Sequence, residues 1–299
     1  MCTRVKCWRL AAPKIHQQWC FSHSPALLSV FVAFTLYIPP LARTGPKWIT
    51  LSQQDVLDVI ASYHSIDPAK TVAGFRQKMP PPVVNEEFRS SILPKLSVDF
   101  ARLRLDDPQL TEAVRKVFDT VLALYNRTRV YEIVIIHHPA PLMMIDSGVA
   151  LLISTGMIER AKSDDELLGY TAHEVGHEFI LRWAFQARQL LHTATLVGND
   201  QALIRKAAEA VALIELECDA FASLTLASLG RNPLAFIDAL EQAGRDFPDQ
   251  SVENHPPYSV RRSIVSGVVP TVTLTRALRR SESFRVMKES LSQLNIGST

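Results

Sequence analysis

The stretch that decides the fold reads Ser163-Asp164-Asp165-Glu166-Leu167-Leu168-Gly169-Tyr170-Thr171-Ala172-His173-Glu174-Val175-Gly176-His177. The first residues of this stretch predict the start of a helix. The hydroxyl of Ser163 can accept a hydrogen bond from a free backbone N–H of the first turn, and the side chain of Glu166, three positions on, can accept one from the N–H of Ser163. The two aspartates between them suit the positive end of the helix dipole. These signals place His173 and His177 inside a helix that starts a little over two turns earlier.

Two histidines four positions apart on a helix share one face, at roughly 5–6 Å between Cβ atoms. His173 and His177 can therefore bind one Zn²⁺ through two imidazole nitrogens. Glu174 is turned along the helix towards the open side of such a metal, where it can take a proton from water. Gly176 allows another element to approach closely, which offsets its poor helix propensity. Random order would produce this His-Glu-x-x-His pattern only about 1% of the time.

A catalytic zinc site of this kind needs a third protein ligand and an open position. Glu215 and Asp219 lie four positions apart on a second predicted helix whose other residues are mostly apolar. Carboxylates on such a helix are costly to bury unless they are paired or bind a metal. We therefore predict Glu215 as the third ligand and Asp219 as the acceptor that orients a ligand histidine. Glu217 points roughly 200° away and is predicted to lie on a solvated face.

The region around these motifs predicts an α+β fold that is mostly α, with a small β-sheet packed on the His-Glu-x-x-His helix. Residues 130–136 and 149–154 are short apolar runs typical of strands. His137 and His138 follow the first run, where we expect a surface or turn position. Helical patterns also cover parts of residues 48–125, and further helices are predicted over residues 201–228, 234–244 and 283–294, with a loop over 254–258.

The first 42 residues differ from the rest of the chain. The net charge is +2 over 299 residues, yet the first 24 carry four basic residues and no acid, which leaves −2 for the remainder. An apolar stretch at residues 26–38 follows, then two prolines and Ala42. This pattern is typical of a signal peptide or a short membrane anchor, with a buried soluble helix as the alternative. It predicts possible membrane association through residues 26–42 and a body outside the cytoplasm, in the cell envelope or periplasm.

Charge and cysteine content narrow the chemistry of the body. A near-neutral body argues against a nucleic-acid partner, whose binding depends on clustered Lys and Arg. Three of the four cysteines precede the apolar stretch, so only Cys218 lies in the body. No Cys-x-x-Cys metal site exists, and Cys218 is expected to be a small buried hydrophobe rather than a thiolate ligand. We divide the chain into residues 1–42, a helical region at 43–125 and a catalytic domain at 126–299.

Four elements in residues 130–262 together resemble the gluzincin metallopeptidase family that contains HtpX, the CAAX prenyl proteases and the Oma-type and periplasmic proteases. They are a threonine-glycine turn at Thr155-Gly156, the helix motif ending at His177, Glu215 with Asp219-Ala220, and His255-Pro256-Pro257 with Arg261. The resemblance implies a zincin-like fold with one Zn²⁺ per chain. It also implies that His255 lies near the catalytic water or the developing oxyanion, and that Arg261 ties its loop to the active-site helices.

Two departures separate this chain from other branches of that family. Leu142-Met143-Met144 stands where the family usually has an asparagine-alanine element on the strand that lines the cleft. No long apolar run follows the one at residues 26–38. In this respect the chain resembles the soluble-domain branch of the family rather than the proteases with several membrane spans.

The function that these features predict is a zinc-dependent endopeptidase acting on protein or peptide substrates of the cell envelope. It would use a metal-activated water, with Glu174 as the general base. The alternative from another class is a catalytically silent protein that keeps the zinc fold as a binding or chaperone-like module. A hydrolase acting on something other than peptide shares the same residues.

Overall fold

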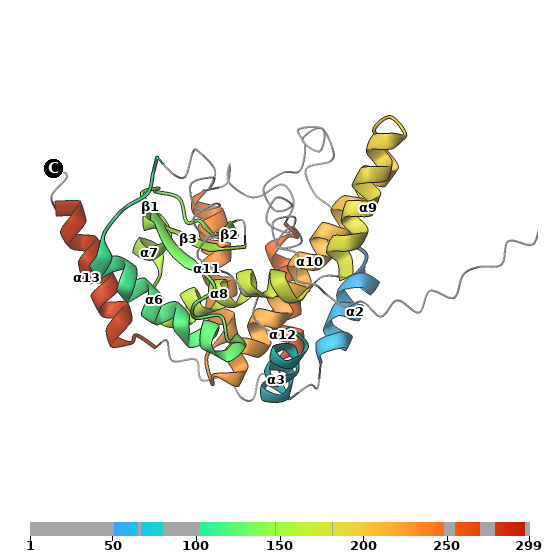
Figure 1. Cartoon of the computed structure of the whole chain (residues 1–299). Helices are drawn as coiled ribbons and strands as arrows, with labels where there is room; N and C mark the ends of the chain where they lie inside the picture. Colours follow the sequence, from blue (N-terminus) through green and yellow to red (C-terminus); the bar gives the residue numbers. More distant parts are fainter. Residues whose placement is uncertain are drawn as a thin grey trace, which may run out of the picture.

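The computed structural model describes residues 51–64, 67–79, 102–146, 148–180, 182–247, 255–269 and 279–296. The predicted export or anchor segment, residues 26–42, lies outside them. Within the described residues the fold is α+β and mostly helical, with a small three-stranded mixed sheet (Figure 1), as predicted. No described helix is long and apolar enough to cross a membrane.

The sheet consists of β1 (Glu132–Ile136), β2 (Met143–Asp146) and β3 (Ala150–Ser154) in the order β1-β3-β2. Strand β1 runs parallel to β3, whereas β2 runs antiparallel to it, with Ile145 opposite Leu151. The two predicted strands are confirmed, each one or two residues shorter at its start. The outer strand β2 was not predicted.

The centre of the molecule is the packing of α8 (Asp164–Phe179) against α10 (Gln201–Ser228). Both helices match the predicted ones, and Ser163 caps α8 by accepting from the N–H of Glu166 at 3.4 Å. The Glu166 carboxylate accepts from the N–H of Lys162 rather than from that of Ser163. The capping pair is therefore displaced by one residue, but the helix begins where it was predicted.

The acids at the start of α8 also hold neighbouring elements in place. Asp164 accepts from both the N–H and the hydroxyl of Ser281, just before α13 (Glu282–Ile296). Asp165 accepts from Arg231 at 3.1 Å, before α11 (Pro233–Asp246). These charged hydrogen bonds fix the amino end of α8 in the fold, beyond the interaction with the helix dipole.

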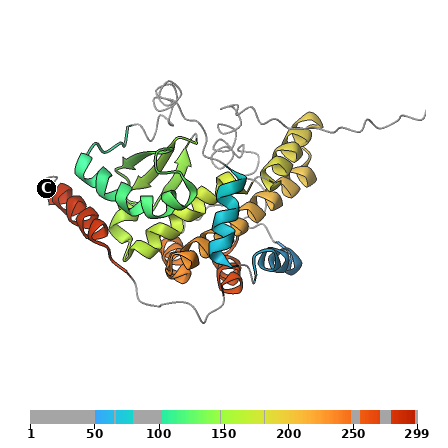
Figure 2. The same ribbon diagram turned by 60° about the horizontal axis from the view of Figure 1, so that its bottom comes forward.

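The strands pack against α6 (Pro108–Leu122) and α8, and the short helix α7 (Thr155–Arg160) follows β3 directly. Figure 2 shows α11 and α12 (Tyr258–Val268) on the side of α8 away from the sheet. Helix α13 packs along α6. Helices α11 and α13 match the predicted ones, whereas α12 was not predicted.

Two helices from the amino-terminal region, α2 (Gln53–Tyr63) and α3 (Pro68–Lys78), pack on α10. This packing overturns the prediction for Glu217. Its side chain is buried, accepting from Trp183 Nε1 at 2.8 Å and from the Tyr63 hydroxyl at 3.3 Å. The face of α10 that carries Glu217 is covered by α2 and by α9 (Arg182–Leu196), so it is not solvated.

Candidate metal centre

Three side chains converge between the two central helices: His173 and His177 from α8 and Glu215 from α10. Each offers one ligand atom, and these atoms lie within 4.8 Å of one another. Glu215 places Oε2 3.1 Å from His173 Nε2 and Oε1 3.7 Å from His177 Nε2. His173 and Glu215 are buried, and His177 is half-buried. This buried group can hold a metal ion.

The close contact of the two helices depends on Gly176, as the sequence predicts. A Cβ atom at this position would lie 3.2 Å from Cδ1 of Phe221 and 3.4 Å from Cα of Cys218, both on α10. A larger side chain would push the helices apart and separate the histidines from Glu215. Cys218 itself is fully buried, as predicted, and burial raises the pKa of its thiol well above the usual range.

Asp219 lies one turn beyond Glu215 and contacts the opposite nitrogen of His173. Its Oδ1 atom is 3.0 Å from His173 Nδ1. An aspartate acceptor at Nδ1 keeps the proton on that nitrogen and directs the lone pair of Nε2 towards Glu215 and His177. Arg261, on α12, donates to both oxygens of Asp219 at 2.7 Å. All the predicted residues on α8, α10 and α12 are therefore brought together.

His255 also lies beside this group. Its Nε2 atom is 3.0 Å from Oε2 of Glu215, and the side chain is 32% exposed. Its Nδ1 atom is buried and has no hydrogen-bond partner among the described residues. His255 directly precedes two prolines that lead into α12, so the same helix that carries Arg261 positions it. The sequence alone would favour a surface position for this histidine.

Glu174 faces the sheet rather than α10. Its Oε2 atom accepts from the backbone N–H of Ile145, on the outer strand β2, at 3.2 Å. Burial raises the pKa of Glu174 to about 7, with the charge of His173 opposing and that of Glu215 adding to the shift. A carboxyl whose pKa lies near neutrality can both take and return a proton, which suits a general acid–base role.

The two histidines of the metal-free site differ in charge. Burial disfavours the charged form of His173, but its hydrogen bonds to Asp219 and Glu215 outweigh this and raise its pKa to about 9. Burial lowers the pKa of His177 to about 4, although Glu215 opposes the shift. The site is thus built to hold positive charge next to Glu215, where a bound cation would take the place of the proton.

Another acid of α8, Glu178, whose side chain is 10% exposed, was not singled out from the sequence. It follows His177 on α8 and accepts from Arg127 Nε at 2.9 Å and from the Tyr131 hydroxyl. The guanidinium of Arg127 also donates to the Tyr125 carbonyl and stacks over the Phe179 ring at 5.0 Å. This ion pair anchors the end of α8 just beyond the histidines. The sequence signal that could have identified Glu178 is an acidic residue on a face of α8 that packs into the fold.

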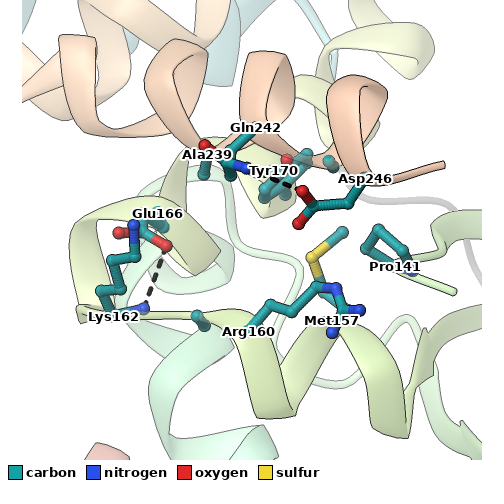
Figure 3. A pocket seen from close by; sticks show the side chains of 11 residues that line it. Pro141, Met157, Arg160, Lys162, Glu166, Tyr170, Ala239, Gln242 and Asp246 are labelled. Carbon is teal, nitrogen blue, oxygen red and sulfur yellow. Dashed lines mark hydrogen bonds between the residues drawn. The ribbon is translucent and has the colours of Figure 1, made fainter. Parts of the chain in front are cut away.

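A cavity of about 290 Å³ lies one helical turn before His173, between α7, α8 and α11 (Figure 3). Its lining includes Tyr170, whose ring packs edge-on against Phe236, which in turn lies 5.9 Å from the His173 ring. Pro141, two residues before β2, lines the opposite side. The rings of Tyr170 and Phe236 therefore lie between the cavity and the metal-binding group. Its remaining lining residues are Met157, Arg160, Ala161, Lys162, Glu166, Ala239, Gln242, Ala243 and Asp246.

Comparison with known proteins adds no family to this description: no protein-family model matches the chain, and no curated protein matches it.

Proposed function

We propose that the chain is a zinc metallopeptidase of the gluzincin type. His173, His177 and Glu215 would hold the ion, and Glu174 would be the general base. The observation that carries the proposal is the convergence of this three-ligand group with Glu174 beside it and Asp219 behind it. The donor set, two imidazole nitrogens and one carboxylate oxygen, is one that catalytic zinc sites use. Asp219 on His173 supplies the outer support that such ligands need.

Zinc, when bound, acts as a Lewis acid that acidifies water and polarises a carbonyl group. The chain itself supplies the proton transfer. Glu174 takes a proton from the attacking water and returns it to the leaving amine. His255, next to Glu215, would donate to the oxygen of the scissile carbonyl as negative charge develops on it.

The outer strand supports a peptide as the substrate. Within the described residues β2 pairs with β3 alone, and Ile145 of β2 donates to Glu174. An extended peptide added along the open edge of β2 would pass Glu174 at its scissile bond. The neighbouring cavity, with Met157, Tyr170 and Ala243 in its wall, would take one side chain of that peptide. This mode of substrate binding needs only backbone hydrogen bonds along β2. It therefore does not depend on the asparagine that is usual in the family and absent from this chain.

The test is a Glu174→Gln variant compared with wild type and with Glu209→Gln, a half-buried acid elsewhere on α10. Glu174→Gln should keep one zinc per chain by metal analysis and lose cleavage of an unfolded protein. Glu209→Gln should keep both. If wild type and Glu174→Gln cut equally, or if neither cuts, the peptidase proposal fails. Zinc binding without cleavage would favour the silent binding module, and a substrate screen would detect a non-peptide hydrolase.

We also propose that the catalytic body lies outside the cytoplasm, led there by the basic and apolar pattern of residues 1–42. A reporter enzyme that is active only outside the cytoplasm, fused after Thr299, should be active. Replacing the four early basic residues with acids should reduce that activity. Reporter activity confined to the cytoplasm would contradict the proposal.

A further inference from the structure

Helix α9 and the first half of α10 form an antiparallel hairpin that projects from the helices around the metal-binding group (Figures 1 and 2). The turn between them contains Gly198 and Asn199, both with positive φ, and Asp200 caps α10 by accepting from two backbone N–H groups. The seam between the helices is made chiefly of alanine. The buried residues there are Ala187, Ala194, Ala207, Ala210 and Val211.

Among residues 184–206 of the hairpin, three large apolar side chains are exposed, and the other leucines and the isoleucine are half-buried. Leu196 is 72% exposed and Val197 59% exposed at the tip, and Phe185 is 66% exposed on the flank. These are three of the four exposed large hydrophobic side chains among the described residues. Phe185 and Leu196 are eleven positions apart, about three turns, so they share one face of α9. Exposed large apolar residues gathered on one projecting element indicate an apolar contact.

The charge around the tip identifies the partner. Residues 182–214 carry four basic side chains and two acids, Glu209 and Asp200, the second of which is engaged as a helix cap. Arg205 and Lys206 are exposed in the first turns of α10, and Arg188 is exposed on α9. The chain outside its first 24 residues is slightly acidic. The hairpin is therefore a local concentration of positive charge with an apolar end.

We propose that the tip of the α9–α10 hairpin docks on an anionic lipid surface, with Leu196 and Val197 among the acyl chains and Arg205 and Lys206 at the headgroups. A projecting apolar tip next to basic residues is the pattern of interfacial membrane-binding elements. A second copy fits less well, because it would bring two positively charged tips together. The inference is independent of zinc binding and of catalysis, since none of these residues belongs to the metal-binding group.

The test must read the tip itself, because residues 26–42 are predicted to bind membranes on their own. Amide hydrogen exchange of the full chain would be measured with vesicles of phosphatidylglycerol and phosphatidylcholine, and with phosphatidylcholine alone. We expect slower exchange over residues 190–206 with the anionic vesicles, and recovery of fast exchange in 0.5 M salt. Leu196→Asp/Val197→Asp and Arg205→Glu/Lys206→Glu should each weaken the protection at least about tenfold in lipid concentration.

Matched controls come from exposed residues that do not belong to the hairpin. Leu57→Asp replaces the fourth exposed large hydrophobic residue, and Arg76→Glu/Lys78→Glu reverses two exposed basic residues on α3. Both should keep wild-type protection at the tip. Unchanged exchange over residues 190–206 in anionic vesicles would overturn the proposal. So would protection that grows with protein concentration without lipid, which would assign the tip to a second copy.

Discussion

Arg261 holds Asp219 by two hydrogen bonds of 2.7 Å, from Nε to Oδ2 and from Nη2 to Oδ1. The same Oδ1 atom contacts Nδ1 of His173. Neither residue offers an atom to the metal-binding group itself, yet the pair determines how His173 presents Nε2 to that group. The orientation of His173 on α8 is therefore fixed by a charge pair between α10 and α12.

Replacing Asp219 with Asn should weaken metal binding by roughly 10–100-fold, because a neutral amide is a poorer acceptor for Nδ1–H. Competition against a chromophoric chelator measures this directly. Glu209→Gln, ten residues earlier on the same helix, should leave the affinity unchanged. Equal affinities for Asp219→Asn and wild type would mean that His173 is not oriented through Asp219.

Replacing Arg261 with Met should cost about 3–5 kcal/mol of folding stability, because it leaves the fully buried Asp219 carboxylate without its main partner. Its neighbour Arg262 forms ion pairs with Asp238 and Glu241 on the surface. Arg262→Met should therefore cost about 1 kcal/mol or less. Denaturant unfolding of the two variants gives the comparison, and similar losses would contradict the assigned burial of the Arg261 pair.

The stability of the metal-free protein should fall as pH rises from about 7 to 9. The pKa of His173 is raised from 6.5 to about 9, so its contribution is complete below pH 6.5 and is lost as pH rises through 9. Glu174, whose pKa is raised from 4.5 to about 7, is half-titrated at pH 7 and adds to the fall in stability up to about pH 8, whereas the effect of His177, with a pKa of about 4, is largely complete below this window. Metal binding should strengthen over the same range, because the ion no longer displaces a proton.

Unfolding by denaturant in the presence of a chelator, at several pH values between 7 and 9, measures this slope. The Asp219→Asn variant should show a smaller slope, because His173 loses one of the groups that raise its pKa. A metal-free protein whose stability is flat across this window would show that His173 is neutral in the folded state.

Two glycines should respond in opposite ways to alanine. A Cβ atom at Gly156 would lie 2.1 Å from the carbonyl oxygen of Pro139, so Gly156→Ala must move backbone and should cost roughly 1–3 kcal/mol. Gly74, within α3, has nothing within 4 Å of its Cβ position. Gly74→Ala should stabilise the protein by roughly 0.5–1 kcal/mol. Thermal unfolding measures both, and a neutral Gly156→Ala would contradict the contact with Pro139.

Filling the cavity beside Tyr170 should change substrate preference, if the proposed function holds. Ala243→Phe places a ring in this space of about 290 Å³. It should reduce cleavage next to large side chains by roughly tenfold more than cleavage next to small ones. Ala69→Phe, on an exposed part of α3, is the control. Cleavage products identified by mass spectrometry reveal the preference, and an unchanged pattern would remove the cavity from the substrate path.

The sequence predicted α8 and α10 well because their signals are local. Ser163 marks the start of one helix, and apolar spacing marks the other. Glu215 and Asp219 could be proposed for a physical reason, since acids on an apolar helix need a partner. The need of a zinc site for a third ligand and an outer acceptor linked them to the histidines of α8, whereas only the resemblance indicated Arg261.

The features that the sequence analysis predicted wrongly or missed depend on contacts between distant elements rather than on local signals. Glu217 is buried because Tyr63 and Trp183 cover it, and nothing in the residues around Glu217 indicates those partners. Strand β2 is four residues long and is defined by its pairing with β3. The fully buried residues of α9 are alanines, and its larger apolar residues are half-buried or exposed. A pattern based on large apolar residues facing inward therefore does not detect it.

Helix α10 is one uninterrupted element from the hairpin turn to the metal-binding group. Glu215 lies fourteen residues after Gln201, which amounts to about 21 Å of helix. With the tip resting on a bilayer, the rise of α10 would hold Glu215 no more than about 21 Å beyond the start of this helix. An extended peptide would cover that height with about six residues. The length of α10 would then set the height above the membrane at which a substrate is cleaved. Peptide bonds closer to the membrane would be spared, and those at the height of Glu215 would be cleaved.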